Sequence, residues 1–148
     1  MTQGVGDLDR SIGYALKQAT VALRAAMEAA LHPLGLTVTQ YSCLELLGQR
    51  KGPSASELAR GAFITRQSMQ TLLLVLEERG LLTRASTAPH GRALPTELTP
   101  AGRQALKEAS RRVAEVEQRM IAALDGPARQ RFLADLVACT AALNDTAG

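Results

Sequence analysis

Apolar and small residues recur every three or four positions along residues 7–34. The recurring positions are Ile12, Leu16, Ala19, Leu23, Ala26 and Ala30. This spacing places them on one face of an α-helix. Pro33 and Gly35 stand at the end of the pattern, and both residue types commonly end helices. The sequence therefore predicts a long amphipathic helix over residues 7–34.

Two S/T-x-x-E/Q patterns predict where the next two helices begin. Thr37 and Gln40 form the first pattern, and Ser54 and Glu57 form the second. In such a capping box the hydroxyl accepts from a backbone N–H of the first turn, and the longer side chain reaches back to the cap. The inward residues of the helix after the first box are Tyr41, Leu44 and Leu47. The second box opens a short helix that ends near Gly61.

A third helix is predicted to begin after Thr65, whose hydroxyl suits an N-cap. Its inward apolar residues are Met69, Leu72, Leu73 and Leu76. Gly80 stands where a glycine commonly follows a helix C-terminus. Two short helices are therefore expected to meet across a tight turn.

Residues 81–86 and 94–98 have the length and composition of short β-strands. They are separated by the segment TAPHGRA, which contains Pro and Gly together with His90 and Arg92. This pattern predicts a hairpin with a basic tip. Pro95 removes a backbone donor from the second strand, so an edge strand or irregular pairing is expected there.

Two more helices complete the pattern. Thr99 and Pro100 suit an N-cap and a first helical position, and they predict a helix to about residue 124. Its apolar seam consists of Leu106, Ala109, Val113, Val116, Met120 and Ala123. The last helix carries Leu133, Leu136, Val137, Thr140 and Leu143.

The apolar faces of the first helix and the last two helices predict packing on a second chain. A three-helix bundle within one chain is the alternative. The expected dimer contacts are Ile12, Leu16, Leu106, Val113, Val116, Met120, Leu136 and Leu143.

Basic residues gather in the middle of the chain. Residues 50–112 contain 11 Lys and Arg against five Asp and Glu, a net charge of +6. The whole chain carries +3, so the remaining residues carry −3. A basic middle indicates a polyanionic partner. Chance clustering on a solvated surface is the alternative.

The composition excludes several classes of protein. The 148 residues suffice for one ordinary domain, or two small lobes sharing one core. No apolar run approaches the roughly 18 to 20 residues of a membrane span, and no signal-peptide pattern is visible, so a cytoplasmic protein is expected. With only Cys43, Cys139, His32 and His90, the usual zinc spacings and a disulfide framework are excluded. Neither a metal nor a cofactor is expected.

The order helix, helix, turn, helix, basic hairpin is that of a winged helix-turn-helix. The predicted fold is mainly α with a small β-hairpin wing. Residues 36–99 form the expected DNA-binding domain, and residues 7–34 and 100–146 form the expected dimerisation helices. A recognition helix of some 15 residues is about 22 Å long, enough to lie across a major groove about 12 Å wide.

The outward face of this helix begins with Arg66, Gln67, Gln70 and Thr71. Gln can bond bidentately to adenine, Arg can bond guanine or phosphate, and Thr can contact phosphate or a thymine methyl. Ser68 and the N-terminal amides of the helix suit phosphate. The alternative is that these residues are simply the polar side of an amphipathic helix.

The sequence contains no common catalytic motif. G-x-S-x-G, H-E-x-x-H, G-x-G-x-x-G and P-loop patterns are absent, and the two histidines lie 58 positions apart. An enzyme is therefore not expected. A winged helix that binds protein is a further alternative, but it would not need the basic middle, and its affinity would not depend on salt.

Three segments carry a family resemblance. The run LARGAFITRQSMQTLLLVLEERGLLTR (residues 58–84) resembles the recognition-helix signature of the MarR (multiple antibiotic resistance regulator) family. The match continues through Arg92 and ELTPAGR (residues 97–103), and GLTVTQYSCLELL (residues 35–47) resembles the second helix of the family. One departure is His90, which stands where the family often has an Asp that steadies the wing arginine.

The resemblance implies a homodimer that binds a pseudo-palindromic operator in double-stranded DNA and usually acts as a repressor. A small ligand, often a phenolic or otherwise aromatic acid, would bind where the dimerisation helices meet the DNA-binding domain and change the spacing of the two recognition helices. The residues expected at the DNA are Ser54, Thr65, Arg66, Gln67, Ser68, Gln70, Thr71, Arg84, His90 and Arg92.

The sequence also contains candidate residues for an effector site and two cysteines. The residues that could offer charge or a hydroxyl to an acidic ligand are Arg24, His32, Tyr41 and Arg112. Their alternative roles are solvated helix charges, a helix-end residue and core packing. Redox sensing through Cys43 or Cys139 is a further alternative, although the apolar neighbours of Cys43 indicate a buried, inert thiol.

Overall fold

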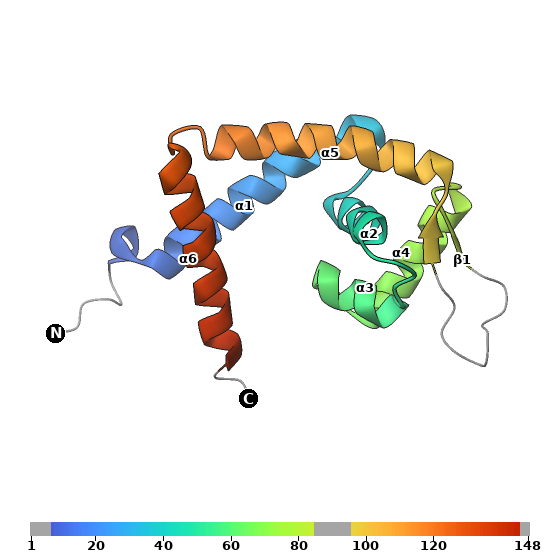
Figure 1. Ribbon diagram of the computed structural model, residues 1–148, viewed down its shortest axis with the longest axis horizontal. Helices are drawn as coiled ribbons and strands as arrows, with labels where there is room; N and C mark the ends of the chain where they lie inside the picture. The colour runs from blue at the N-terminus through green and yellow to red at the C-terminus, as the bar shows by residue number, and fades with distance from the viewer. Residues whose placement is uncertain (1–6, 85–95, 146–148) are drawn as a thin grey trace. The chain divides into compact units, whose positions relative to one another are not determined.

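The computed structural model describes residues 7–84 and 96–145 and is mainly helical (Figure 1). The expected hairpin tip, with His90 and Arg92, lies outside the described residues. The helices are α1 (Ile12–Leu31), α2 (Val38–Gln49), α3 (Ala55–Ala62), α4 (Arg66–Glu78), α5 (Pro100–Met120) and α6 (Gly126–Asp145). Short 3-10 turns, Leu8–Arg10 and His32–Leu34, flank α1. The strands are β1 (Leu82–Arg84) and β2 (Thr96–Leu98).

Both predicted capping boxes are confirmed. The Thr37 hydroxyl accepts from the Gln40 N–H at 3.1 Å, and the Gln40 side-chain oxygen accepts from the Thr37 N–H at 3.1 Å. Ser54 and Glu57 pair in the same way at 3.1 and 2.8 Å. The hydrogen bonds from Ser54 hold the pKa of Glu57 below its usual value. These caps satisfy backbone donors that a helix start otherwise leaves unpaired.

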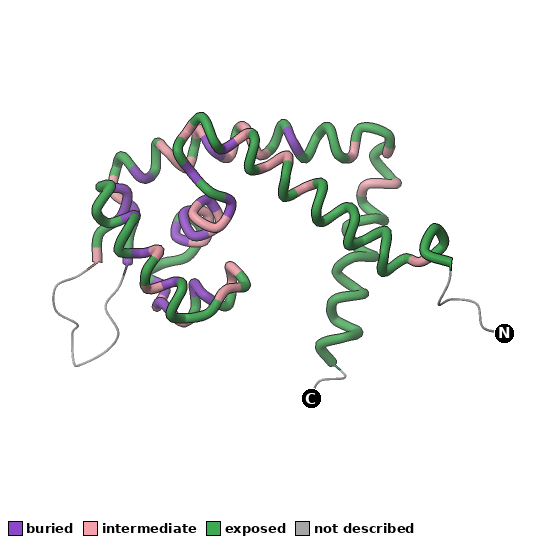
Figure 2. Tube along the Cα trace, turned by 180° about the vertical axis from the view of Figure 1, so that it is seen from behind, coloured by how far each residue is buried: buried purple, intermediate pink, exposed green. Residues whose placement is uncertain are grey.

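The central core lies where α2, α3, α4 and the hairpin meet, and the end of α1 and the first part of α5 join it. Its fully buried members are Leu31, Cys43, Leu44, Leu58, Met69, Leu73, Leu76 and Ala109. Figure 2 shows the buried segments concentrated around α2, α3 and α4. The predicted inward face of α4 is therefore confirmed, with Leu72 partly buried beside it.

The two strands form an antiparallel pair. Leu82 faces Leu98, Thr83 faces Glu97 and Arg84 faces Thr96. Residues 85–95, which include parts of both predicted strands and Pro95, lie outside the described residues. Gly80 adopts a φ of +76°, the left-handed conformation expected after a helix C-terminus.

The chain divides into two compact units, Met1–Val116 and Glu117–Gly148. The predicted boundaries at residues 36 and 100 divide the chain by function and stay a prediction. Leu31 of α1 and Ala109 of α5 are both completely buried in the central core. Helices expected to serve dimerisation are thus part of the same packed unit as the helix-turn-helix.

The expected dimer contacts fall into two groups. Ile12, Leu16, Met120, Leu136 and Leu143 are exposed in the single chain, with exposed fractions from 36% to 85%. Leu106 and Val113 instead pack against the central core, and Val116 is buried within the chain. The dimer contacts stay a prediction, because periodicity identifies an apolar face without identifying what covers it.

Helix α6 begins at Gly126 and ends at Asp145. Asp125 caps it by accepting from the Ala128 N–H at 2.9 Å, and none of its residues is buried. Leu133, Val137 and Leu143 are 60% to 76% exposed. Within the described part of the chain, no helix combines the length and apolarity needed to cross a lipid bilayer.

Candidate nucleic-acid interface

The N-terminal turn of α4 is held by Thr65. Its hydroxyl accepts from the Ser68 N–H at 3.0 Å and donates to the Ser68 hydroxyl oxygen at 2.9 Å. The turn before it contains Phe63, which has a φ of +61° and is 93% exposed. This left-handed residue ends α3 and lets the chain turn into α4, a role that the sequence did not predict.

Helix α4 has an apolar face that packs into the core and a polar face that is largely exposed. Met69, Leu73 and Leu76 are completely buried, which fixes the orientation of the helix. The polar face is led by Arg66, Gln67, Ser68 and Thr71, all exposed, with Gln70 partly buried. A surface hollow of about 360 Å³ is lined by Thr65, Gln67, Ser68 and Thr71.

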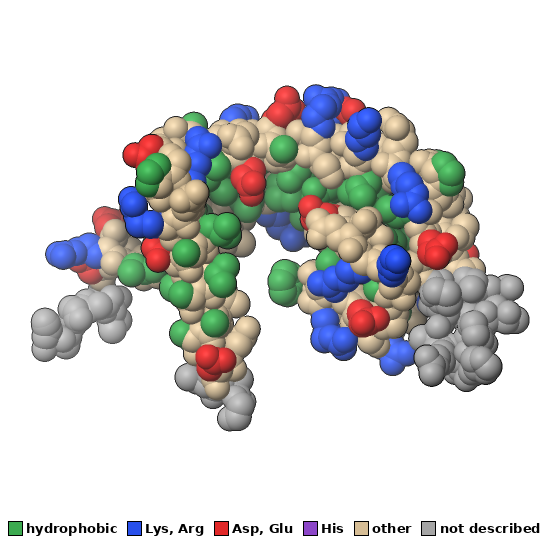
Figure 3. Space-filling view, in the orientation of Figure 1, with side chains coloured by type: hydrophobic (Ala, Val, Ile, Leu, Met, Phe, Trp, Pro, Cys, Tyr) green, Lys and Arg blue, Asp and Glu red, His purple; other side chains and the backbone are tan. Residues whose placement is uncertain are grey.

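The chemistry of this face suits a polyanion that also carries hydrogen-bonding edges. Free backbone N–H groups and the positive end of the helix dipole lie at its N-terminus. Hydroxyl and amide side chains stand beside them, and Figure 3 shows Lys and Arg side chains around α3 and α4. Such a face can bind phosphates with its helix end and base edges with its amides.

Arg84 of β1 is hydrogen-bonded to a residue of this face. Its Nη1 donates to the Gln70 side-chain oxygen at 3.2 Å, and its Nε is buried with no hydrogen-bond partner. Both residues were expected at the DNA, but the bond between them was not predicted. No local pattern signals it, because the two residues lie 14 positions apart on different elements.

Ser54 is partly buried and serves as the N-cap of α3, as its capping box predicts. Its expected contact with DNA stays a prediction. The wing residues His90 and Arg92 lie outside the described residues, so their roles also stay predictions.

The four residues expected at an effector site take part in different contacts. Tyr41 is 4% exposed, and its hydroxyl donates to Glu45 at 3.1 Å and lies 3.5 Å from the Ser110 hydroxyl of α5. Arg24 of α1 lies 3.5 Å from the Thr39 hydroxyl. Arg112 pairs with Glu108 along α5 at 3.4 Å.

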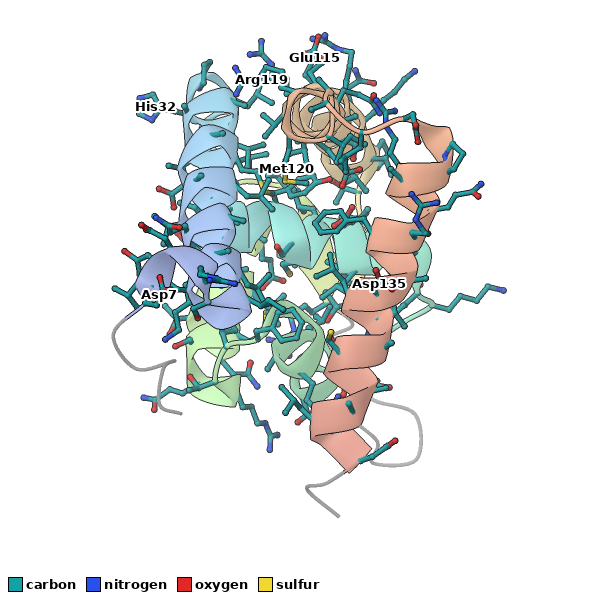
Figure 4. The ribbon with its side chains drawn as sticks, turned by 90° about the vertical axis from the view of Figure 1, so that its left-hand side faces the viewer. Asp7, His32, Glu115, Arg119, Met120 and Asp135 are labelled. Carbon is teal, nitrogen blue, oxygen red and sulfur yellow. The ribbon has the colours of Figure 1, made fainter. Side chains whose placement is uncertain are left out.

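His32 stands at the end of α1, exposed, with its ring pointing outward (Figure 4). Tyr41 of α2 therefore contacts α5, and Arg24 of α1 contacts α2. The structure does not bring all four into one described pocket, and the effector site stays a prediction.

The two cysteines have opposite environments. Cys43 is completely buried, and desolvation raises the pKa of its thiol to about 12, whereas Cys139 on α6 is exposed. Among residues 7–84 and 96–145, no three His, Cys, Asp or Glu side chains gather into a possible metal site.

We expect Cys43 to be chemically inert in the folded protein, because the reactive form of cysteine is the thiolate. In a Cys139→Ser variant, a thiol-specific chromogenic disulfide should label no thiol at pH 8 in buffer and one thiol in denaturant. The unsubstituted chain should release two equivalents in denaturant. Rapid labelling of Cys43 in the native variant would contradict its burial and revive redox sensing at this position.

Helices α3 and α4, joined by a short turn and followed by the β1–β2 pair, form a winged helix-turn-helix. Residues 34–93 match the family model described as MarR family. The chain belongs to the MarR family of regulators.

One relative matches both in sequence and in structure. The HTH-type transcriptional repressor Rv2887 of Mycobacterium tuberculosis is 40% identical over 129 residues, covering 87% of this chain and 92% of the relative. A crystal structure of Rv2887 with DNA has a TM-score of 0.73 at 36% identity and covers 88% of this chain and 98% of that one.

Ligand complexes of Rv2887 and of a second protein, the repressor CouR, are also similar to this chain. The crystal structure of Rv2887 with salicylic acid has a TM-score of 0.73 at 39% identity and covers 88% and 97% of the two chains. The transcriptional repressor CouR bound to p-coumaroyl-CoA has a TM-score of 0.78 at 31% identity and covers 94% and 98%. The fold and the family are thus established by sequence and structure together.

Proposed function

We propose that this protein is a dimeric, sequence-specific DNA-binding repressor that a small aromatic ligand releases from its operator. The observation that carries the proposal is helix α4, anchored through three fully buried apolar residues and presenting a polar, amide-rich face. The DNA complex of the relative Rv2887 supports it. Such a regulator has no catalytic role and acts in the cytoplasm.

The residues of the interface divide into two chemical roles. Gln67, Gln70 and Thr71 face outward from the first two turns of α4 and are the proposed readers of base edges. Phosphate contacts would come from the helix N-terminus and from hydroxyl and cationic side chains. The proposed phosphate and groove contacts are Ser54, Thr65, Arg66, Ser68, His90 and Arg92, and Arg84 is proposed at this interface beside Gln70.

The proposed dimer explains apolar surface that a single chain leaves exposed. Ile12, Leu16 and Leu143 are 85%, 48% and 76% exposed. Burial of such residues between two chains is favourable by about 25 cal/mol per Å² of apolar surface. A symmetric dimer would present one recognition helix to each half of a palindromic site.

The proposed effector is an aromatic acid, a class supported by the salicylic acid complex of Rv2887. Such a ligand releases DNA only if it binds more tightly to the conformation that fits the operator poorly. Arg24, His32, Tyr41 and Arg112 remain the proposed ligand contacts. The contacts of Arg24 with α2 and of Tyr41 with α5 would couple ligand binding to the spacing of the two α4 helices.

The test is to select bound fragments from random double-stranded DNA with the purified protein at moderate salt. We expect an inverted repeat whose half-sites lie about one helical turn, roughly 34 Å, apart. Affinity for that repeat should fall steeply as salt rises, because phosphate contacts release counterions. Salicylate should then lower the affinity of the selected operator while benzyl alcohol, which lacks the carboxylate, should not.

The controls separate the alternatives. A folded dimer that enriches no motif, or whose binding does not depend on salt, would instead support a winged-helix module that binds protein. Loss of operator binding after peroxide treatment, abolished by Cys139→Ser, would support a thiol-based sensor.

A further inference from the structure

We propose that Arg84 is a positioning residue that turns the Gln70 amide, so that Gln70 meets DNA with its amino group instead of its carbonyl oxygen. This inference rests on the proposed DNA-binding function and specifies how one position of the operator is read. Gln70 then becomes a reader of hydrogen-bond acceptors, with a base preference that Arg84 imposes.

The chemistry of the contact defines the orientation of the amide. Nη1 of Arg84 lies 3.2 Å from Oε1 of Gln70. A guanidinium carries only donors, so the amide atom that faces it must be the carbonyl oxygen. The usual ambiguity between the oxygen and nitrogen of a glutamine side chain is thereby removed. The Nε2 amino group is the end of Gln70 that remains for DNA.

Gln70 and Arg84 both lie on elements that pack into the core. Gln70 directly follows Met69, which is completely buried, and Arg84 lies two residues after Leu82, which is 1% exposed. The Arg84 side chain is itself partly buried, and its Nε is shielded from solvent without a hydrogen-bond partner. An arginine that served only as a surface charge would keep this donor in water. The guanidinium is therefore held inward, where its bond to Gln70 is the contact that the structure describes.

The pattern of hydrogen-bond donors and acceptors in the major groove predicts which base this orientation of Gln70 favours. A glutamine free to turn can bond adenine bidentately, accepting from N6 and donating to N7. With its oxygen turned toward β1, Gln70 offers donors, which match the two neighbouring acceptors O6 and N7 of guanine. Adenine presents the acceptor N7 beside an amino donor, thymine presents the single acceptor O4, and cytosine presents an amino donor. Gln70 is thus expected to favour guanine at the base edge it contacts.

The experiment compares operators selected by the unsubstituted protein and by Gln70→Ala, Arg84→Met and Arg84→Lys. Gln70→Ala identifies the base position that Gln70 reads. At that position the unsubstituted protein should favour guanine over adenine by roughly threefold to tenfold, the effect of one hydrogen bond. Arg84→Met, which keeps an apolar stem but removes the donors, should shift this position toward adenine. Arg84→Lys, which restores a donor, should recover the original preference.

A charge-matched control is Arg60→Met. Arg60 is an exposed cation in the last turn of α3, and its loss should change overall affinity and salt dependence without changing the preference at the Gln70 position. A double-mutant cycle on unfolding, with Gln70→Ala and Arg84→Met, checks the bond in the free protein. The two substitutions should be non-additive if the bond forms.

The outcomes are distinct. If the unsubstituted protein enriches a motif and Gln70→Ala alters one position, but Arg84→Met only weakens binding uniformly, Arg84 is a phosphate contact and the inference is wrong. Additive effects in the unfolding cycle would also overturn it. Failure of the unsubstituted, folded dimer to enrich any motif would reject the proposed function itself and, with it, the reading role of Gln70.

Discussion

Replacing Gly102 with Ala is expected to lower the free energy of unfolding by about 3 kcal/mol, among the larger effects of overpacking a buried site. Gly102 is buried in the first turn of α5. A Cβ there would overlap the carbonyl oxygen of Leu81 and lie 2.9 Å from its carbonyl carbon. Both atoms are backbone, so the clash cannot be relieved by rotating a side chain.

The hydrogen bonds around this contact explain why the backbone cannot simply shift. The Leu81 carbonyl accepts from the Thr99 N–H at 3.1 Å, and the Thr99 hydroxyl donates to the Gly80 carbonyl at 2.6 Å. The same hydroxyl accepts from the Gly102 N–H at 3.0 Å. Moving α5 away from Leu81 would stretch this network, which joins the end of α4 to the start of α5.

The measurement is chemical denaturation followed by circular dichroism, at one protein concentration because dimerisation contributes to stability. The matched control is Gly13→Ala, in α1, where a Cβ would meet only the Ser11 hydroxyl at an ordinary 3.9 Å. Alanine favours a helix over glycine, so the control should keep or gain stability. Equal stability of Gly102→Ala and the unsubstituted protein would show that the α5 junction is more deformable than the structure indicates.

Gln67→Ala is expected to weaken binding to the selected operator by roughly 1 to 3 kcal/mol, the range for loss of a base-edge contact. Gln67 is exposed in the first turn of α4 and lines the hollow with Thr65, Ser68 and Thr71. Because Met69 and Leu73 hold the helix in the core, removing this outward amide should leave the fold unchanged. Binding to random DNA should change little, since it depends mainly on phosphate contacts.

Fluorescence anisotropy with a labelled operator and a random duplex, at a fixed salt concentration, measures both affinities. Gln49→Ala is the matched control, because Gln49 is an equally exposed glutamine at the end of α2, outside the α4 face. It should leave both affinities unchanged. If Gln67→Ala weakened the two duplexes equally, Gln67 would be a backbone contact and the proposed placement of α4 would be wrong.

The predicted elements are largely confirmed where short-range signals define them. The boxes at Thr37 and Ser54 begin α2 and α3, Thr65 begins α4, and Gly80 follows its end. Each signal involves residues within one helical turn of one another. The energies of these caps are local, so they can be predicted without knowing the rest of the fold.

The sequence does not decide which surface covers an apolar face. Leu106 and Val113 are partly buried and Val116 is buried within the single chain, and their expected contact with a partner chain stays a prediction. A heptad pattern is the same whether the covering surface is a second copy or another part of the same chain. The alanines and leucines of the terminal helices therefore predict a buried face without specifying its neighbour.

The amino-acid sequence alone was sufficient for the order of elements, the starts of α2, α3, α4 and α5, the polar face of α4 and the family to which the chain belongs. Only the tertiary structure decided that Arg84 bonds Gln70 and that Tyr41 contacts Ser110 across 69 positions. The physical reason is the separation of the interacting residues along the sequence. Caps and periodicity depend on neighbours along the chain, whereas these contacts depend on which side chains meet after the helices have packed.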